Sequence, residues 1–233
     1  GIWGIGLVPT GERDPYALRR AALGLISAVE QLAAGHFLNL QTKLSLNVLL
    51  EFAAGTFENI TLNPNTVDEV QAFIYERYRN QLNGDYDRSV VDAVIALAPP
   101  LHEIIDRVKA VTAFAQLPEA DSLAAANKRI ANLLKKVDGS LPAINSEILL
   151  EPAEKALANT IDKIQPVALD HFGKGEFEAS LSSIASTREA VDTFFTDVMV
   201  MAEDPAIRNN RLALLSVLHG TMNLVADISR LAK

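Results

Sequence analysis

Cysteine is absent from this chain of 233 residues, which excludes disulfide bonds, thiol catalysis and thiolate metal sites. Histidine occurs only four times, and no histidine has a second ligand at the spacing that metal sites use. These histidines are His36, His102, His171 and His219. We therefore expect no metal site and no cofactor in this chain. The lack of cysteine also fits a cytoplasmic protein.

Long apolar runs are missing as well. No stretch of eighteen apolar residues occurs, so no membrane span is expected. The first six residues lack the basic flank and cleavage site of a signal peptide, and they lack the lysine and following helix of a phosphate-binding loop. Because the chain does not begin with methionine, we interpret it as a C-terminal fragment of a longer protein.

Positive charge is scarce. The net charge is −8, and both halves of the chain share it. A protein that binds nucleic acid normally carries a surplus of Lys and Arg on at least one face. Composition alone therefore favours an acidic helical interaction module, and any nucleic-acid site must be a local basic face.

Hydrophobic residues make up 49% of the sequence, and they recur with the 3.6-residue period of amphipathic helices. This pattern predicts an all-α fold, a helical bundle with a domain boundary near Pro99 and Pro100. Two predicted helices begin with an aspartate cap followed by proline, at Asp14-Pro15 and Asp204-Pro205. Another begins with a capping box at Thr66, and a shorter one is capped by Asp87. The longer predicted helices cover 39–54, 101–117, 121–137, 152–172, 176–201 and 205–231, and Pro166 should kink or interrupt one of them.

Two stretches at opposite ends of the chain carry a family resemblance. One runs from Pro9 to Gly24 and reads PTGERDPYALRRAALG. The other comprises Thr187-Arg188-Glu189, the run FFTDVMVM at 194–201, Asn210-Arg211-Leu212 and the run VADIS at 225–229. In order and spacing, both resemble the C-terminal part of the β subunit of bacterial heterotetrameric glycyl-tRNA synthetase.

The resemblance implies a fold, an activity and partners. Residues 1–100 would be the end of the HD-like helical body, and residues 101–233 an α-helical anticodon-binding domain of the DALR type. The chain would bind glycine tRNA, with no DNA or membrane partner, inside an α2β2 heterotetramer. The α subunit would hold ATP, magnesium and glycine and perform the ligase chemistry. An HD-type hydrolase is not expected, because Asp170-His171 has the reverse order and is interpreted as a surface pair.

The segment 121–137 carries the main candidate tRNA site. Its polar residues fall at helical neighbour spacings, opposite a stripe of leucine, isoleucine and valine. They are Asn127, Lys128, Arg129, Asn132, Lys135 and Lys136. Cations suit phosphates, and amide or planar groups suit splayed bases. The alternative is an ordinary solvated helix face.

Arg208 and Arg211, near the start of the last predicted helix, are further candidates. They could clamp a phosphate beside the helix N-terminus. Equally, Arg211 could pair with Asp192, Asp197 or Glu203 and hold two helices together. For Arg188 we expect a structural pair with Asp192, four residues on. The contacts should lie near the start of this helix, because 218–225 has lost the basic character of relatives.

Other residues of the resemblance are harder to assign. Phe194 and Phe195 could stack on bases, but their place in an apolar stripe predicts core packing, and the same reasoning covers Met199 and Met201. Arg13, Arg19 and Arg20 could contact the tRNA backbone, another domain or the α subunit.

Two hypotheses follow from the sequence. The first is the tRNA-binding part of a glycine–tRNA ligase, without catalytic residues of its own. The second is a helical scaffold that docks the α subunit and makes little direct contact with RNA. A basic strip that joins Lys128, Lys135, Arg208 and Arg211 would favour the first, and a large apolar patch with scattered charges the second.

Overall fold

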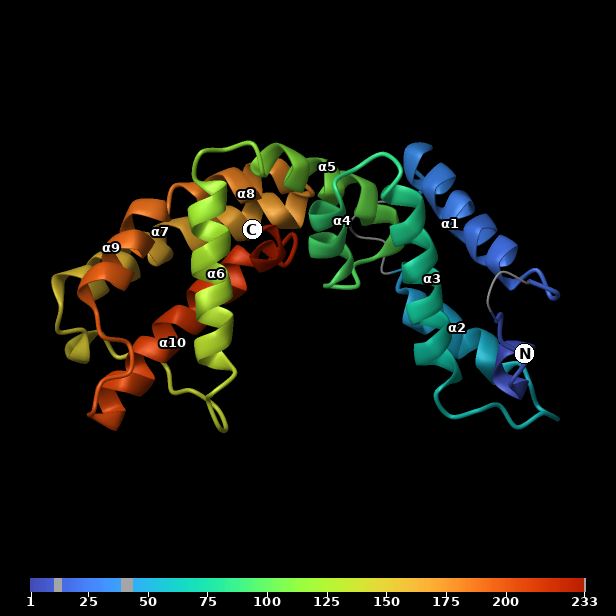
Figure 1. Ribbon diagram of the computed structural model, residues 1–233, viewed down its shortest axis with the longest axis horizontal. Coiled ribbons are helices and arrows are strands. Elements are labelled where there is room, and N and C mark those ends of the chain that lie inside the picture. The colour runs from blue at the N-terminus through green and yellow to red at the C-terminus, as the bar shows by residue number, and fades with distance from the viewer. Residues whose placement is uncertain (11–13, 39–43, 233) are drawn as a thin grey trace. The chain divides into compact units, whose positions relative to one another are not determined.

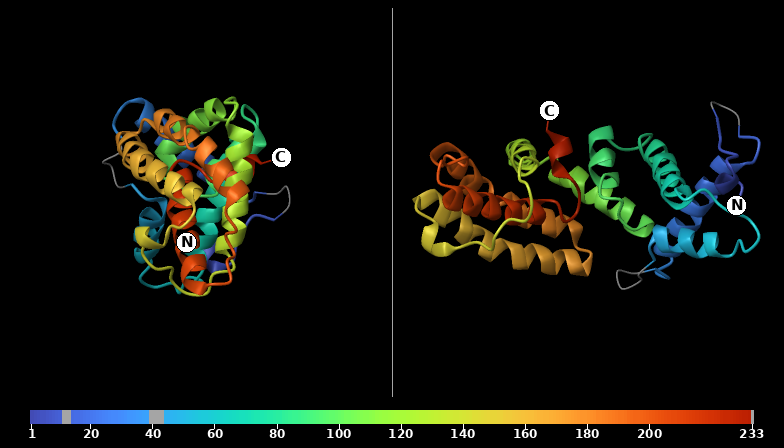
Figure 2. Two further views of the ribbon diagram at one scale, coloured as in Figure 1. Left: turned by 90° about the vertical axis from the view of Figure 1, so that its left-hand side faces the viewer. Right: turned by 90° about the horizontal axis from the view of Figure 1, so that it is seen from below.

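The computed structural model describes residues 1–10, 14–38 and 44–232. In these ranges it contains ten α-helices and four short 3-10 helices, and no strand, which confirms the predicted all-α class (Figure 1, Figure 2). The chain divides into two compact units. Unit 1 comprises 1–91 and 98–105, and unit 2 comprises 92–97 and 106–233. Helices α4 (Arg88–Ile95) and α5 (Ile104–Phe114) each contribute residues to both units.

Helix α3 (Thr66–Leu82) is the centre of unit 1 and contacts both α1 (Leu18–Ala34) and α2 (Leu46–Gly55). Two short 3-10 helices, η1 (Trp3–Ile5) and η2 (Leu101–Glu103), complete this unit. The Tyr75 hydroxyl donates to the carbonyl oxygens of Ala98 (3.0 Å) and Pro99 (2.7 Å). Trp3 Nε1 donates to Glu69 Oε2 at 2.8 Å. Side chains of α3 therefore tie η1 and the segment that precedes η2 to the centre of the unit.

Unit 2 is built from the longer helices. They are α6 (Ala120–Leu134), α7 (Pro152–Lys174), α8 (Phe177–Ala185), α9 (Arg188–Asp197) and α10 (Pro205–Met222), with η3 (Ser146–Ile148) and η4 (Ile228–Leu231). Helix α7 packs against α8, α9 and α10, while α6 packs against α9, α10 and η4. Leu123, Leu157, Leu181, Phe194 and Leu215 are among its fully buried side chains. One apolar core thus joins helices that are distant in the sequence.

Arg107 is a buried cation of unit 2 that the sequence reasoning missed. Its guanidinium donates to the carbonyl oxygens of Leu224 (3.1 Å) and Val225 (2.9 Å). It lies 5.0 Å from the ring centroids of both Phe172 and Phe177. Burial of a charge needs such partners, so Arg107 holds the segment after α10 against α5 and α7. No sequence signal distinguishes Arg107 from its charged neighbours Asp106 and Lys109 in α5.

Several predicted helix starts are confirmed. Asp204 caps α10 through its carboxylate, which accepts from the N–H of Ala206 at 2.7 Å, and Pro205 is the first helical residue. Asp87 precedes α4 and accepts from the N–H of Ser89 at 2.8 Å. These hydrogen bonds lower the pKa of the Asp87 carboxyl, with the Ser89 hydroxyl as the largest cause.

One other predicted start is wrong, and one predicted cap is absent. Helix α1 begins at Leu18 rather than Pro15, because Ala17 adopts a left-handed conformation with φ 56°. Asp14 still accepts from the N–H groups of Leu18 (2.8 Å) and Arg19 (3.1 Å), so it caps the helix from one turn away. The capping box at Thr66 does not form, because Thr66 is the first helical residue and the preceding residue makes no side-chain cap.

Two helices end earlier than predicted, and a third continues through a proline. The segment 176–201 is not one helix: it breaks at Ser186 and Thr187, whose hydroxyls donate to the carbonyls of Ser183 and Ile184, both at 2.7 Å. Helix α10 ends at Met222 rather than near 231. Helix α7 runs through the exposed Pro166 without interruption, because water can reach the carbonyl that the missing N–H leaves free. Of the helix predicted at 39–54, residues 39–43 lie outside the described residues.

Candidate nucleic-acid interface

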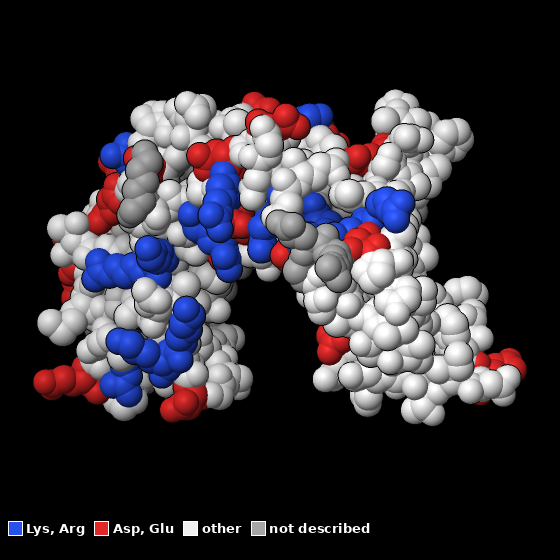
Figure 3. Space-filling model, turned by 45° about the vertical axis from the view of Figure 1, so that its right-hand side comes forward, with Lys and Arg blue, Asp and Glu red and all other residues white. Residues whose placement is uncertain are grey.

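Helix α6 separates an apolar face from a basic one. Leu123, Ala124 and Ile130 are fully buried against the rest of unit 2. Lys128, Arg129 and Asn132 are exposed on the other side, and the exposed Lys135 and Lys136 follow directly after the last turn. Figure 3 shows Lys and Arg side chains gathered on the left-hand part of one face, the part of unit 2 where α6 lies. We call Lys128, Arg129, Lys135 and Lys136 the α6 cations.

The α6 cations differ from other cations of unit 2 in their partners. Lys109, Lys174, Arg188 and Arg230 each pair with an aspartate three or four residues away in the sequence, at 2.6 to 3.4 Å. Among the described residues, no carboxylate lies within ion-pair distance of any α6 cation. Four unpaired cations on α6 and directly after it create a local positive potential on an acidic chain. This charge is available to an external anion such as phosphate.

Asn127 does not belong to this exposed surface. It is fully buried, and its amide exchanges hydrogen bonds of 2.8 and 3.2 Å with the amide of Asn223. The Asn223 side chain also accepts from the N–H of Ile228 at 3.2 Å and donates to the carbonyl of His219 at 2.9 Å. The pair therefore links α6 to the end of α10 and to η4, and we leave Asn127 out of the proposed interface.

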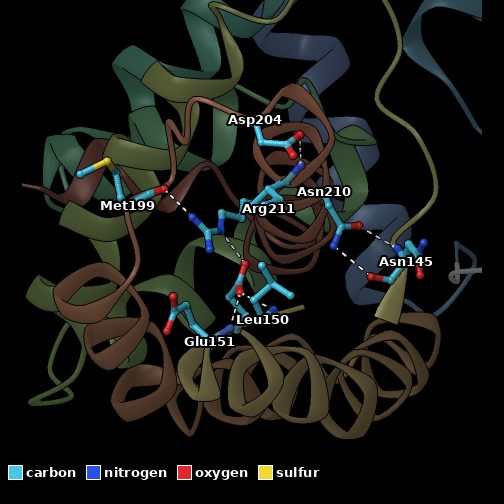
Figure 4. Close-up of polar contacts among 9 residues, drawn as sticks. Asn145, Leu150, Glu151, Met199, Asp204, Asn210 and Arg211 are labelled. Carbon is cyan, nitrogen blue, oxygen red and sulfur yellow. Dashed lines mark hydrogen bonds and ion pairs between the residues drawn. The ribbon is translucent and has the colours of Figure 1, made fainter. Parts of the chain in front are cut away.

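Arg211 is also buried, and Figure 4 shows how it is held. Its Nε donates to Glu154 Oε1 at 2.6 Å, and a terminal nitrogen donates to the carbonyl of Met199 at 2.8 Å. The other Glu154 oxygen accepts from the N–H groups of Leu150 (2.8 Å) and Glu151 (2.7 Å). Arg211 thus has the structural role that the sequence left open, with Glu154 of α7 as its partner.

The surroundings of Glu154 favour its charged form. Burial by itself raises the pKa of a carboxyl group. The hydrogen bond and charge of Arg211, with the two backbone N–H groups, outweigh burial and lower the pKa of Glu154 below its ordinary value. The Glu154 carboxylate therefore has a cationic partner and two backbone donors, and Arg211 cannot turn to a phosphate without leaving Glu154 unpaired.

Arg208 and Asn210 hold loops at the start of α10. Arg208 is half-exposed and donates to the carbonyl of Ala202 at 3.1 Å. The Asn210 amide accepts from the N–H of Asn145 at 2.7 Å and donates to its carbonyl at 3.0 Å, as the sticks in Figure 4 show. The Asp204 carboxylate already occupies the first N–H groups of α10, so this helix end offers less to an anion than the sequence suggested. Arg208 keeps an exposed portion that could reach RNA.

The aromatic and methionine residues of the resemblance divide into three groups. Phe194 is fully buried, as predicted. Phe195 is only half-buried, and the Arg129 guanidinium lies 4.2 Å from the centroid of its ring. The core prediction is wrong for Met199 and Met201, which are 74% and 49% exposed. They lie in the loop before α10, whose carbonyl groups, rather than its side chains, are bound by Arg208 and Arg211.

The remaining candidates lie in unit 1. Arg20 is exposed on α1, and Arg19 is half-exposed and has interaction partners. Arg13 lies outside the described residues. Among described residues, then, the basic positions of the resemblance are distributed between both units, and the α6 cations are those that gather on one helix of unit 2.

Other chemistry has little support in the described residues. No three His, Asp or Glu side chains among them lie close enough to hold a metal ion. Asp170 pairs with Lys174 at 2.6 Å and His171 with Glu176 at 2.6 Å, so the reversed Asp-His pair consists of two neighbouring surface contacts. Hydrogen bonding and charge from Lys174 lower the pKa of Asp170. Within the same residues, no helix combines the length and the apolar character that a membrane crossing requires.

Comparison with known proteins gives two family matches. Residues 1–96 match the profile described as glycyl-tRNA synthetase beta subunit, and residues 123–228 match the DALR anticodon binding domain. The second match includes α6, α9 and α10. It therefore contains the α6 cations, the buried amide pair and the Glu154–Arg211 pair.

Relatives named glycine–tRNA ligase beta subunit match the whole chain. Those from Ralstonia nicotianae, Neisseria gonorrhoeae and Methylobacillus flagellatus are 47%, 45% and 45% identical to it. The chain spans about a third of the length of these relatives: 32%, 33% and 32%. The chain is therefore similar over its whole length to part of glycine–tRNA ligase beta subunits, and residues 123–228 are similar to the DALR anticodon binding domain.

Proposed function

We propose that this chain is the tRNA-binding, anticodon-recognising portion of a glycine–tRNA ligase β subunit. Residues 101–233 would form the anticodon-binding domain and residues 1–100 the end of the helical body. The observation that carries the proposal is the set of unpaired α6 cations within the DALR match. An acidic chain that leaves four neighbouring cations without carboxylate partners has the local basic face that RNA binding needs.

The chemistry of α6 suits an anticodon loop. Lysine is a compact, flexible cation that binds phosphate oxygens, and Lys128, Lys135 and Lys136 are all exposed. Asn132 is exposed between them, and its amide can donate to and accept from the edge of a splayed base. Phosphate contacts position an RNA and base contacts specify it. One helix would therefore supply both kinds of contact.

The rest of the activity belongs to the assembled enzyme. We assign ATP, magnesium and glycine to an α subunit that performs ATP-dependent attachment of glycine to its tRNA, in an α2β2 heterotetramer in the cytoplasm. In this arrangement the present chain contributes no catalytic residue, and its task is to hold and recognise glycine tRNA.

The first experiment is a titration of this chain with unmodified glycine tRNA and with a tRNA that differs only in its anticodon. Each titration is run at two salt concentrations. We expect tighter binding of glycine tRNA, with an affinity that falls as salt rises. Equal and weak binding of both RNAs would contradict anticodon recognition by this chain.

A matched pair of triple variants tests the position of the site. Lys128→Gln/Lys135→Gln/Lys136→Gln should reduce the salt slope of log affinity by about 2 to 3, because each lost phosphate contact reduces it by about 1. The control, Lys109→Gln/Lys163→Gln/Lys174→Gln, changes the net charge equally on α5 and α7. Equal losses in both triple variants would mean that only overall charge matters.

A second function, docking of the α subunit, is supported by unit 1. Helix α2 exposes Val48, Leu49 and Phe52, and Phe57 and Ile60 are exposed in the segment that follows it. An apolar group of this kind on a small helical unit is typical of a protein interface. Phe52→Ser should weaken binding to purified α subunit without changing tRNA affinity. Unchanged binding to the α subunit would remove this assignment.

A further inference from the structure

Arg129 and Phe195 form a stacked pair at the surface of unit 2. The guanidinium of Arg129, on α6, lies 4.2 Å from the centroid of the Phe195 ring, on α9. Arg129 is nevertheless exposed. Among the described residues, no carboxylate pairs with Arg129. The planar cation thus contacts an aromatic ring, has no carboxylate partner and remains accessible to solvent.

The surrounding packing holds this pair in place. The Phe195 ring contacts Phe194 edge-on at 5.6 Å, and Phe194 is fully buried. One end of the α6–α9 contact is fixed by Ser122, whose hydroxyl donates to Asp192 at 2.7 Å. Ser122 and Arg129 are two turns apart on α6, so the two helices are joined at two separate points. A cation held in this way loses little conformational entropy when it binds a ligand.

We propose that the outer face of Arg129 is a stacking surface for one unpaired base of the anticodon loop, with Phe195 as its support. This proposal rests on the proposed function, because it names a subsite of the same RNA interface. Guanidinium planes stack on nucleobases and also attract the nearby phosphates.

The neighbouring side chains provide the other contacts that a splayed base needs. Asn132 lies three residues after Arg129, the spacing of adjacent positions on one helix face, and is exposed. Among the described residues its amide has no hydrogen-bond partner, so it can bind the edge of a base that stacks on Arg129. Lys128, Lys135 and Lys136 provide charge for the phosphates on either side. Phe195 thus contributes to binding by supporting Arg129, and it does not itself contact the RNA.

The test uses the whole chain and glycine tRNA in which each anticodon nucleotide in turn is made abasic. Arg129→Lys keeps the charge and removes the plane, and Phe195→Leu keeps apolar bulk and removes the ring. Arg188→Lys is the matched control, because Arg188 is an exposed arginine paired with Asp192. Far-UV circular dichroism checks that every variant is folded.

We expect Arg129→Lys to bind intact tRNA about 5- to 100-fold more weakly, the range found when single base-stacking contacts are removed. Against the tRNA that is abasic at the stacked position, Arg129→Lys and the unaltered chain should bind equally. Phe195→Leu should show the same pattern with a smaller loss, and Arg188→Lys should show none. This dependence on one base separates stacking from charge or fold, neither of which depends on a single nucleobase.

Three results would overturn the proposal. Arg129→Lys could bind every RNA as the unaltered chain does, which would remove the stacking role and leave the proposed function standing. It could lose the same factor for all RNAs, which would make Arg129 a phosphate contact or a packing residue. If the unaltered chain does not bind glycine tRNA at all, the proposed function itself fails and the subsite with it.

Discussion

The two units differ in what they leave exposed and in how they are held together. Unit 1 exposes a group of apolar side chains on and after α2, of which Phe52 is 77% exposed. Unit 2 leaves cations of α6 unpaired and buries polar side chains that bridge distant helices, such as Asn127 with Asn223 and Glu154 with Arg211. The apolar group suits a protein partner and the cations suit RNA. If both proposals hold, this acidic chain carries two kinds of binding surface, one in each unit.

The largest expected effect is on the buried ion pair of unit 2. Arg211→Met leaves Glu154 buried without its partner, which should lower the free energy of unfolding by about 3–5 kcal/mol. The double variant Glu154→Gln/Arg211→Met should recover part of this loss, because no uncompensated charge remains. Urea unfolding, followed by far-UV circular dichroism, measures both values.

Unit 1 offers a contrast to this buried ion pair, an exposed hydrogen bond from Trp3 to Glu69. Glu69→Gln should change the free energy of unfolding by less than about 1 kcal/mol. The sequence has a single tryptophan, Trp3, so its fluorescence reports on unit 1 while circular dichroism reports on the whole chain. If Arg211→Met shifts both signals equally, the two units unfold together and do not have separate free energies of unfolding.

Acid should weaken the buried pair of Glu154 and Arg211. The pKa of Glu154 is lowered in the folded chain, so its stabilising effect is present above its unfolded value of 4.5 and is lost as pH falls through the folded pKa. The unaltered chain should therefore lose stability below about pH 4.5 more steeply than Glu154→Gln. Urea unfolding between pH 3 and 7 gives the two curves. Parallel curves over this range would mean that Glu154 keeps an unshifted pKa.

The amide pair should have an intermediate effect. Asn127→Ala leaves the Asn223 amide without its partner on α6, which should lower the free energy of unfolding by about 1–3 kcal/mol. Asn80→Ala, at an exposed position of α3 in unit 1, is the matched control and should change it by less than about 0.5 kcal/mol. A loss of affinity for tRNA without a loss of stability in Asn127→Ala would instead assign Asn127 to the interface.

A smaller effect of the opposite sign is expected at two helical glycines. Gly24 in α1 and Gly220 in α10 have open space where a Cβ would be added. Alanine at either position should raise the free energy of unfolding by about 0.5–1 kcal/mol, because it restricts the unfolded chain and favours the helix. The stabilisation should be similar for Gly24→Ala in unit 1 and Gly220→Ala in unit 2. Thermal unfolding of each variant measures it. Destabilisation of one variant alone would reveal a packing constraint around that glycine.

The smallest effect should come from Phe52→Ser. The side chain is mostly exposed, so its replacement should change the free energy of unfolding by no more than about 0.5 kcal/mol. A Leu215→Ala control in the core of unit 2 should lose about 2–5 kcal/mol. A large loss in Phe52→Ser would show that the apolar group of α2 supports the fold rather than a partner.

Much of the local structure could be predicted from the sequence. Caps at Asp87 and Asp204 depend on residues a few positions apart, and the helical period is a property of one segment. The exposed side of α6, with Lys128, Arg129 and Asn132, follows from the same period. Where prediction failed locally, a neighbouring side chain competed for the backbone: the hydroxyls of Ser186 and Thr187 end α8.

By itself, the sequence determined the all-α class, the family resemblance and the side of α6 that carries cations. Only the tertiary structure decided which polar residues are available for binding. Arg211 finds Glu154 across 57 positions, and Asn127 finds Asn223 across 96, distances over which no periodic pattern operates. Burial then requires each of these groups to keep its partner, because an unpaired polar group in an apolar core costs free energy. The same long-range packing placed Arg129 over Phe195 and left Arg129 exposed.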